Sequence, residues 1–338
     1  MRLLFVYPFF LRESALEKKW RTPYPPLGLL YLAAMARQAG HAVSLFDGTF
    51  QPGAEAFDDA YDAFSPDVVC LASLVTLRPT ALSLARLARA RGAAVIVGGQ
   101  DAASAPEAYL DSGLISAIVV GEGEETLVEL LEALSGSLIL DGVKGIAYSD
   151  KRGAPRFTPS RPPIADLEVL PLPARDLVDV APYFQLWRST HGYASLALAA
   201  SRGCPFGCEH CASSGWAHWR VRRPEAVAAE MHALQTQYAP DHFRFVDDLD
   251  GLGHDWLQAL GDAMEAAGVT TPYEGLRLHV KLGNLPMLMR RMELCADRNA
   301  WIPKSASHPH APPGLGQAEL HLRWAEAKLP DGAVLAEP

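Results

Sequence analysis

The stretch AAVIVGGQDAAS, residues 93–104, runs from apolar residues directly into two glycines and a polar tail. A short apolar run that is rich in β-branched residues and ends at a turn predicts a buried strand. Four similar runs occur before residue 124, namely RLLFVY (2–7), AVSLFD (42–47), DVVCLAS (67–73) and SAIVVGEG (116–123). Together, the five runs predict the strands of one sheet.

Helical segments separate these runs. PLGLLYLAAMARQAG at 26–40 and RPTALSLARLARARG at 78–92 carry apolar residues at helical spacing, and each segment stops at a glycine. Strands that alternate with helices predict an α/β fold with a doubly wound parallel sheet, of the flavodoxin-like kind. Ligands of such sheets bind beyond the carboxyl ends of the strands.

Three loops at this predicted edge are small and polar: SLVT at 73–76, GGQDAAS at 98–104 and GEGEET at 121–126. Glycines let a bulky ligand approach the backbone, and hydroxyl groups offer hydrogen bonds. Each loop is also compatible with an ordinary strand-to-helix turn, in which GEGEET supplies acidic residues to the first helical turn. Three such loops on one edge favour a ligand site. No G-x-G-x-x-G follows the first strand, which argues against a dinucleotide.

The composition is that of a globular protein with more than one domain: 338 residues, 49% hydrophobic and 20% charged. The opening MRLLFVYPFFL resembles a signal peptide, but Pro8 interrupts it and no cleavage site follows, so we expect a buried strand and a cytoplasmic protein. No eighteen-residue apolar run predicts a membrane span. A net charge of −9 argues against a nucleic-acid partner. No oligomeric state is predicted.

Three of the five cysteines, Cys204, Cys208 and Cys211, lie close together in SRGCPFGCEHC. They follow a predicted strand, ASLALAA at 194–200, and precede a predicted helix that begins near Pro224. Clustered thiols of odd number favour a metal over a disulfide framework, and soft thiolates select zinc or an iron–sulfur centre. Zinc is the alternative, although it normally takes four ligands, and His210 adjoins Cys211 too closely to serve easily.

The spacing C-x₃-C-x₂-C at the end of a strand resembles the signature of radical S-adenosylmethionine enzymes. This resemblance implies that the three cysteines hold a [4Fe–4S] cluster, whose open iron binds S-adenosylmethionine and whose electron releases a 5′-deoxyadenosyl radical. The family usually has an aromatic residue at the position that His210 occupies here.

Further motifs resemble the cobalamin-binding branch of that family over residues 1–250. They occur in the same order: PYPPLGLLYLA, VGGQDAASAPE, VVGEGEETLVELLEAL, LPLPARDL and SRGCPFGC. The resemblance implies a cobalamin without a histidine ligand to cobalt, since the loop after the first strand contains no histidine. The implied contacts are Ser73, Leu74, Thr76, Gly98, Gly99, Gly121, Glu122 and Gly123. Alternatively, the domain has kept its sheet and lost its cobalamin.

HFRFVDDLDG at 242–251 predicts a second barrel strand. The resemblance implies that Asp247 and Asp248 contact the amino group of S-adenosylmethionine, and a carboxylate suits an ammonium group. The alternative is a strand that ends in a solvated turn. Arg202 and the arginines within 220–223 flank the cysteines and are more simply explained as surface residues.

The predicted division has four parts. Residues 1–138 form a Rossmann-like cobalamin-binding domain, 139–193 a proline-rich linker with a small hairpin around 151–153, 194–300 a partial radical S-adenosylmethionine core, and 301–338 an irregular tail. Fewer residues follow Cys211 than a full barrel of this family generally needs, so an incomplete (β/α) barrel is expected. Cys70 and Cys295 are expected to be buried, and His308 and His310 to be solvated.

The leading hypothesis is a radical S-adenosylmethionine enzyme that transfers a methyl group through cobalamin to an unactivated carbon of a small molecule. An external electron donor of the flavodoxin or ferredoxin type would reduce the cluster. Two alternatives stay open: a radical cyclase or oxidoreductase resembling the anaerobic magnesium-protoporphyrin monomethyl ester cyclase, and a truncated, non-catalytic protein that binds cobalamin or an iron–sulfur cluster. No catalytic side chain is assigned.

Overall fold

A computed structural model describes residues 1–203, 219–247 and 254–274. The chain divides into two compact units. The N-terminal unit comprises residues 1–165 and 169–182, and the C-terminal unit comprises 166–168 and the residues from 183 onward. Cys204, Cys208, Cys211, Asp248, Cys295, His308 and His310 lie outside the described residues.

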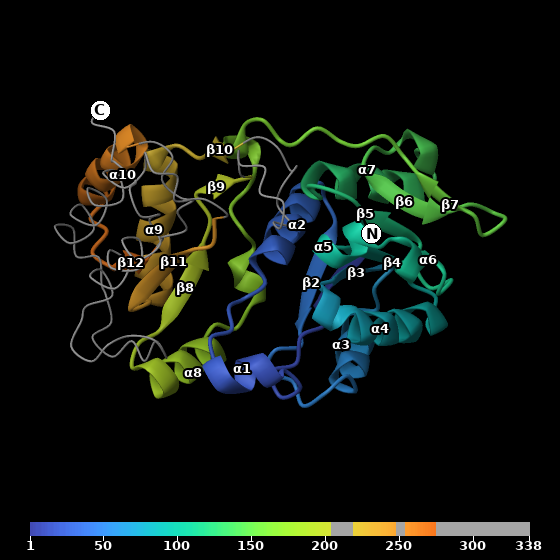
Figure 1. The fold of residues 1–338 in the computed structure, drawn as a ribbon, viewed down its shortest axis with the longest axis horizontal. Helices are drawn as coiled ribbons and strands as arrows, with labels where there is room; N and C mark the ends of the chain where they lie inside the picture. Colours follow the sequence, from blue (N-terminus) through green and yellow to red (C-terminus); the bar gives the residue numbers. More distant parts are fainter. Residues whose placement is uncertain (204–218, 248–253, 275–338) are drawn as a thin grey trace, which may run out of the picture. The chain divides into compact units, whose positions relative to one another are not determined.

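The N-terminal unit is built on a seven-stranded sheet with the order β2-β1-β3-β4-β5-β6-β7 (Figure 1). Its strands are β1 (Arg2–Tyr7), β2 (Ala42–Asp47), β3 (Val68–Ala72), β4 (Ala94–Gly98), β5 (Ala117–Val119), β6 (Ile146–Ser149) and β7 (Pro155–Phe157). The first five strands are parallel, and β6 and β7 are antiparallel additions. The order 2-1-3-4-5 is flavodoxin-like, which confirms the predicted doubly wound sheet.

Helices cover both faces of this sheet (Figure 1). The helices of the unit are α1 (Ala15–Trp20), α2 (Leu27–Gln38), α3 (Ala56–Phe64), α4 (Arg78–Ala90), α5 (Gln100–Ser104), α6 (Glu107–Leu110) and α7 (Glu124–Leu134). Short 3₁₀ helices are η1 (Val75–Leu77), η2 (Leu140–Gly142) and η4 (Arg175–Leu177). One buried cluster joins α3, α4 and α6 to one face, and a second joins α2 and α7 to the other.

The strand β3 illustrates how the apolar runs fill both clusters. Val69 and Leu71 belong to one cluster, whereas Val68 and Cys70 belong to the other, because successive side chains point to opposite faces. Burial raises the pKa of the Cys70 thiol to about 12. A strand that is covered on both faces is therefore apolar throughout, as the run predicts.

Two glycines end helices where the sequence predicts it. Gly40 after α2 has φ of +86°, and Gly92 after α4 has φ of +89°. Glycine adopts this left-handed conformation without the clash that a Cβ atom brings.

The region predicted as a linker is more structured than its prolines suggest. β6 and β7 form the expected hairpin, in which the amide of Gly153 donates to the carbonyl of Asp150 at 2.9 Å. Because β6 pairs with β5, this hairpin extends the sheet of the N-terminal unit beyond residue 138. The helix α8 (Ala181–His191) also lies within the predicted linker. Asp179 accepts a hydrogen bond from the amide of Ala181 at 3.0 Å and so caps its start.

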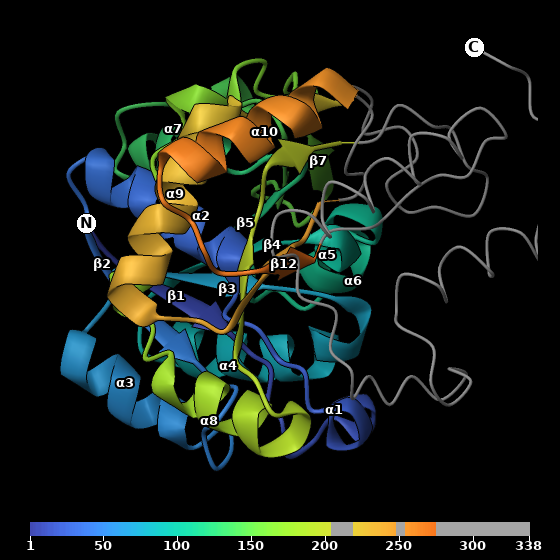
Figure 2. The same cartoon turned by 90° about the vertical axis from the view of Figure 1, so that its left-hand side faces the viewer.

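The C-terminal unit contains a parallel sheet with the order β12-β11-β8 (Figures 1 and 2). Its elements are η3 (Leu167–Val169), β8 (Ser195–Leu198), β9 (Ser201–Arg202), β10 (Arg220–Val221), α9 (Pro224–Tyr238), β11 (His242–Phe245), α10 (His254–Ala266) and β12 (Tyr273–Glu274). α9 connects β8 to β11, α10 connects β11 to β12, and the two helices lie side by side. Each new strand adds beside the previous one, as at the start of a (β/α) barrel.

The predicted barrel strands and helices lie where the sequence places them. β8 falls within 194–200, β11 begins the run at His242, and α9 starts at Pro224, which suits the first helical turn. A further strand, β12, begins at Tyr273, and the residues after Glu274 lie outside the described part of the chain. In the described part of the chain, no helix has the length and apolar character needed to cross a membrane.

Candidate functional site

The carboxyl edge of the N-terminal sheet gathers the predicted cobalamin contacts. After β3, the side chain of Ser73 is buried, whereas Leu74 is 44% exposed and Val75 70% exposed. Thr76, Gly99 and Gly121 are also exposed, and Gly98, Glu122 and Gly123 are partly exposed. The edge therefore exposes the apolar side chains of Leu74 and Val75, and it also exposes glycine backbone that a ligand can approach closely.

Gly99 allows the ends of β3 and β4 to come together. Its φ is +117°, and a Cβ atom at this position would lie 2.3 Å from the carbonyl oxygen of Ser73. The amide of Ser73 donates to the carbonyl of Gly98 at 2.7 Å. Only glycine combines this φ with so close an approach to backbone, which explains why position 99 in the predicted loop is a glycine.

Ser73 is the first member of a polar network under this edge. Its hydroxyl forms a short hydrogen bond with the hydroxyl of Tyr109. Tyr109 donates to Oδ2 of Asp101 at 2.5 Å, and Nε of Arg78 donates to the same oxygen at 2.8 Å. The guanidinium of Arg78 holds the pKa of Asp101 below its usual value, and burial raises the pKa of Tyr109.

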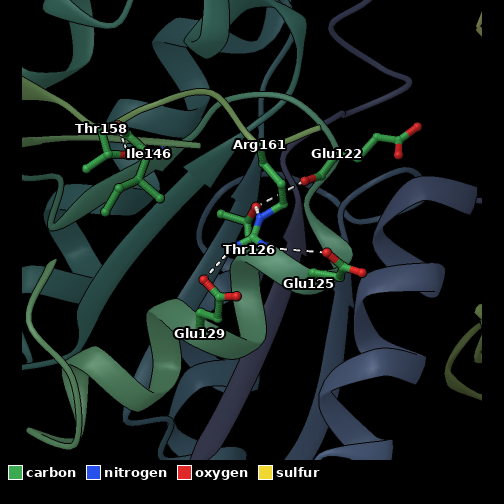
Figure 3. A network of polar contacts seen from close by, with 7 residues as sticks. All are labelled: Glu122, Glu125, Thr126, Glu129, Ile146, Thr158 and Arg161. Atoms are coloured by element: carbon green, nitrogen blue, oxygen red, sulfur yellow. Dashed lines mark hydrogen bonds and ion pairs between the residues drawn. The ribbon is translucent and has the colours of Figure 1, made fainter. Parts of the chain in front are cut away.

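Glu122 has a structural partner in the segment that follows the hairpin. Its Oε2 accepts a hydrogen bond from the amide of Ile164 at 2.7 Å. Figure 3 shows Arg161 beside the first turns of α7, where its Nε donates to Oγ1 of Thr126 at 2.8 Å and its other nitrogens reach Glu125 and Glu129. This contact set attaches the segment after β7 to the loop that carries Glu122.

The described residues that flank the cysteine segment follow the carboxyl end of β8 in sequence. β9 precedes the segment and β10 follows it, and the two pair antiparallel, with Ser201 opposite Val221 and Arg202 opposite Arg220. The amide of Arg222 donates to the carbonyl of Ala200 at 2.8 Å and continues this pairing. The chain just before the cysteine segment is therefore paired with the chain just after it.

Asp247, at the end of β11, fixes the start of this pair. It is 3% exposed, and its Oδ1 accepts hydrogen bonds from the amide of Ala200 at 2.9 Å and from the hydroxyl of Ser201 at 3.0 Å. It also accepts a short hydrogen bond from the amide of Ser201. The carboxylate that resemblance assigned to S-adenosylmethionine thus holds backbone three residues before Cys204.

Arg222 fixes the chain that follows the cysteine segment. Its Nη1 donates to the carbonyl of Ala199 at 3.0 Å and to Oε2 of Glu230, on α9, at 2.5 Å. Nε1 of Trp256, on α10, donates to the carbonyl of Arg222 at 2.8 Å. Arg222 and Glu230 form a buried ion pair, so this arginine is not the surface residue that the sequence suggests.

A recess of about 320 Å³, a volume that includes space open to solvent, lies beside Asp247. It is lined by Ala200, Ser201, Trp219, Val221, Phe245, Asp247, Trp256, Leu257, Leu260 and Tyr273. Its wall is mostly aromatic and aliphatic. Its most polar members are Asp247 and Ser201, and the hydroxyl of Ser201 donates a hydrogen bond to Asp247.

Sequence reasoning missed several of these side chains. Tyr109, Asp101 and Arg78 act on Ser73 from α6, α5 and the start of α4, and Glu230 acts on Arg222 from α9. Burial separates Tyr109, Asp101 and Glu230 from surface residues, whereas the side chain of Arg78 is 32% exposed. A pattern of charged residues on helices does not show which of them are buried.

Comparisons with known proteins agree with this architecture. The family model of the B12 binding domain matches residues 16–131. An uncharacterized methyltransferase of Pyrococcus horikoshii is 33% identical over 258 residues, which cover 73% of this chain and 53% of the relative. The solved structure of the cobalamin-dependent S-adenosylmethionine radical enzyme OxsB, with aqua-cobalamin and S-adenosylmethionine bound, aligns with a TM-score of 0.69. The chain therefore contains a match to the B12 binding domain, is similar to a methyltransferase, and shares its fold with a cobalamin-dependent S-adenosylmethionine radical enzyme.

The likeness to OxsB is one of fold, since the identity is 19% over 88% of this chain and 42% of that protein. The chain is also similar to the anaerobic magnesium-protoporphyrin IX monomethyl ester cyclase of Synechocystis, which is 30% identical over 66% of this chain and 45% of the cyclase. The chain spans about half the length of the curated relatives it matches.

Proposed function

We propose that the protein is a radical S-adenosylmethionine enzyme that uses cobalamin to transfer a methyl group to an unactivated carbon of a small molecule. One observation carries the proposal: a single chain combines the B12 binding domain with a C-x₃-C-x₂-C segment that follows the parallel strand β8 in sequence and is flanked by the paired strands β9 and β10. The first part suits a cobalamin, and the second suits an iron–sulfur cluster with one open iron.

The carboxyl edge of the N-terminal sheet fits a broad, flat ligand. Leu74 and Val75 offer exposed apolar surface, and Gly98, Gly99 and Gly121 bring backbone to the edge without side chains in the way. These residues, with Thr76 and Gly123, would hold the cobalamin.

The thiol donor set of Cys204, Cys208 and Cys211 fits an iron–sulfur cluster, because soft thiolates at this spacing leave one ligand position for another molecule. When bound, the cluster and cobalamin would supply the electron that cleaves S-adenosylmethionine and the carrier of the methyl group. The role of the described residues is to hold the cysteine segment: Asp247 anchors its start, and Arg222 anchors its end. An electron donor of the flavodoxin or ferredoxin type and a cytoplasmic location belong to the same proposal.

A cyclase activity is the second candidate, favoured by the similarity to the Synechocystis cyclase. Methyl transfer is preferred because the methyltransferase of Pyrococcus horikoshii is more similar and shares a larger part of both chains. Isotope tracing separates the two. In a methyl transfer, labelled methyl from S-adenosylmethionine appears in the product, whereas ring closure incorporates no label.

The test is anaerobic reconstitution of the full chain with iron and sulfide, in the presence of hydroxocobalamin, followed by addition of S-adenosylmethionine and a reductant. We expect an iron–sulfur absorption band, a retained corrin spectrum and formation of 5′-deoxyadenosine. The variant Cys208→Ala is the control and should lose iron and 5′-deoxyadenosine together.

Three outcomes would contradict the proposal, each in a distinct way. A fully loaded cluster that forms no 5′-deoxyadenosine would favour a non-catalytic binding protein. Stoichiometric zinc without iron would favour a structural zinc site. A protein that retains no corrin would mean that the domain has kept its sheet without its cobalamin.

A further inference from the structure

The carboxyl edge of the N-terminal sheet is the proposed binding site of cobalamin, and the inference drawn from it rests on that proposal. Ser73 and Leu74 are neighbours, yet Ser73 is 1% exposed and Leu74 is 44% exposed. The chain therefore turns from the sheet interior to the surface within one residue. The polar network under this edge explains which side chain is held inside.

The hydrogen-bond donors of this network can be assigned from its chemistry. The Asp101 carboxylate only accepts hydrogen bonds, so the single proton of the Tyr109 hydroxyl goes to Asp101. The oxygen of Tyr109 then accepts the proton of Ser73. The hydroxyl proton of Ser73 is therefore already used within the protein and is not offered to a ligand.

The carboxylate at the far end of the network is itself held in place. Nε and Nη2 of Arg78 donate to its two oxygens, at 2.8 and 2.5 Å, in a bidentate pair. The guanidinium carbon of Arg78 also lies 5.6 Å from the centre of the Tyr109 ring. Tyr109 thus has its hydroxyl and its ring fixed by groups from α4 and α5.

We propose that Tyr109, Asp101 and Arg78 are positioning residues for the cobalamin site: they hold Ser73 inside the sheet edge, so that Leu74 and Val75 form the surface that contacts the corrin ring. The predicted role of Ser73 changes accordingly. It acts as the anchor of the loop and does not donate a hydrogen bond to the ligand.

A double-mutant cycle tests this assignment in the full chain. Tyr109→Phe, Ser73→Ala and the double variant are titrated with hydroxocobalamin, and binding is followed by the corrin absorption. Each single change should raise the Kd about tenfold, the scale of one hydrogen bond to a charged network. The double variant should bind no more weakly than either single variant, because both remove the same link.

Tyr148→Phe is the matched control. Tyr148 also donates a short hydrogen bond to a carboxylate, that of Asp141, but from β6 to η2. Its removal should leave the Kd for hydroxocobalamin unchanged. Full additivity of Ser73→Ala and Tyr109→Phe, or normal binding by Tyr109→Phe, would overturn the proposal and return Ser73 to direct ligand contact.

A measurement without any ligand keeps this inference separate from the proposed function. The amide of Ser73 donates to Gly98 at 2.7 Å, and that of Leu77 donates to Leu74 at 2.8 Å. Both amides should exchange hydrogen faster in Tyr109→Phe than in wild type or Tyr148→Phe. Unchanged exchange would refute the positioning role. A wild type that fails to bind hydroxocobalamin would refute the cobalamin proposal, whatever the exchange result.

Discussion

The two sheets differ at their carboxyl ends. In the N-terminal unit, Leu74 and Val75 are exposed beside glycine backbone. In the C-terminal unit, the charged residues Asp247, Arg222 and Glu230 are buried. Both ends contain a buried carboxylate. In the N-terminal unit, the carboxylate of Asp101 accepts hydrogen bonds from the side chains of Arg78 and Tyr109. In the C-terminal unit, Asp247 bonds the amides of Ala200 and Ser201.

The two carboxylates differ in the kind of group that donates to them, and this difference indicates a different role for each sheet end. A carboxylate that orders side chains leaves the surface above it free for a ligand. A carboxylate that accepts from backbone amides fixes where a loop departs, and here that loop carries the cysteines. Under the proposed function, the N-terminal edge would therefore contact the ligand itself, whereas the C-terminal edge would support the segment that carries the ligating cysteines.

The largest effect is expected at Asp247. Asp247→Ala leaves two buried amides and one hydroxyl without their acceptor, which should lower the free energy of unfolding by about 4 kcal/mol. Asp247→Asn keeps one acceptor oxygen and should cost about half as much. Urea unfolding measures both. Equal stability of Asp247→Ala and wild type would show that the carboxylate does not hold the backbone.

The next effect tests the N-terminal edge through Gly99. Gly99→Ala introduces a Cβ atom 2.3 Å from the carbonyl oxygen of Ser73 and requires a φ of +117°, so it should cost about 3 kcal/mol. Gly98→Ala is the control, because its Cβ atom would meet Val119 at an ordinary 3.7 Å. It should cost less than about 1 kcal/mol in the same urea unfolding experiment. Similar losses for both variants would contradict the close approach of β3 and β4.

A pH-dependent effect on stability is expected in the C-terminal unit. His242 on β11 is buried, with Nδ1 3.1 Å from the hydroxyl of Ser195, and burial lowers its pKa to about 4, with Arg244 contributing. The unfolded chain binds the proton near pH 6.5, so stability falls as the pH drops from 6.5 toward 4. Between pH 7 and pH 5 the loss should be about 2 kcal/mol.

The control variants for this pH effect are His242→Gln and His232→Gln, compared by urea unfolding at both pH values. The first should remove most of the difference between pH 7 and pH 5, and the second should preserve it. A difference that survives in His242→Gln would assign the pH dependence to other groups.

The smallest effect on stability is expected at Val75. Because this side chain is 70% exposed, Val75→Ser should change the free energy of unfolding by less than about 0.5 kcal/mol. If the N-terminal edge is a binding surface, the same variant should still weaken hydroxocobalamin binding several-fold in an absorbance titration. If Val75→Ser lost stability but bound hydroxocobalamin normally, Val75 would serve the stability of the sheet edge and not ligand binding.

Local patterns predicted the elements of the fold well, and for identifiable reasons. Apolar runs such as 67–73 became strands because a sheet covered on both faces needs apolar side chains on both. Gly40 and Gly92 ended helices because they adopt positive φ. The helix α8 was missed because prolines around it suggest an extended linker, while its cap at Asp179 and its buried aromatic residues favour a helix.

The roles of the site residues were harder to predict, because they depend on partners far apart in the chain. Ser73 meets Tyr109 across 36 positions, and Asp247 meets Ala200 across 47. The sequence marks the loops where these residues lie but carries no sign of the direction in which each side chain turns. Resemblance suggested ligand contacts for Ser73 and Asp247, and the structure adds intramolecular partners for both.

The burial of Cys70 has a practical consequence for preparing the protein. Its thiol lies within β3, and burial raises its pKa to about 12, so at neutral pH it stays protonated and out of reach of added iron and alkylating reagents. Labelling of native protein should therefore leave Cys70 unmodified, and unfolding should make it reactive. The fraction of Cys70 that reacts only after unfolding thus measures how much of each preparation is correctly folded.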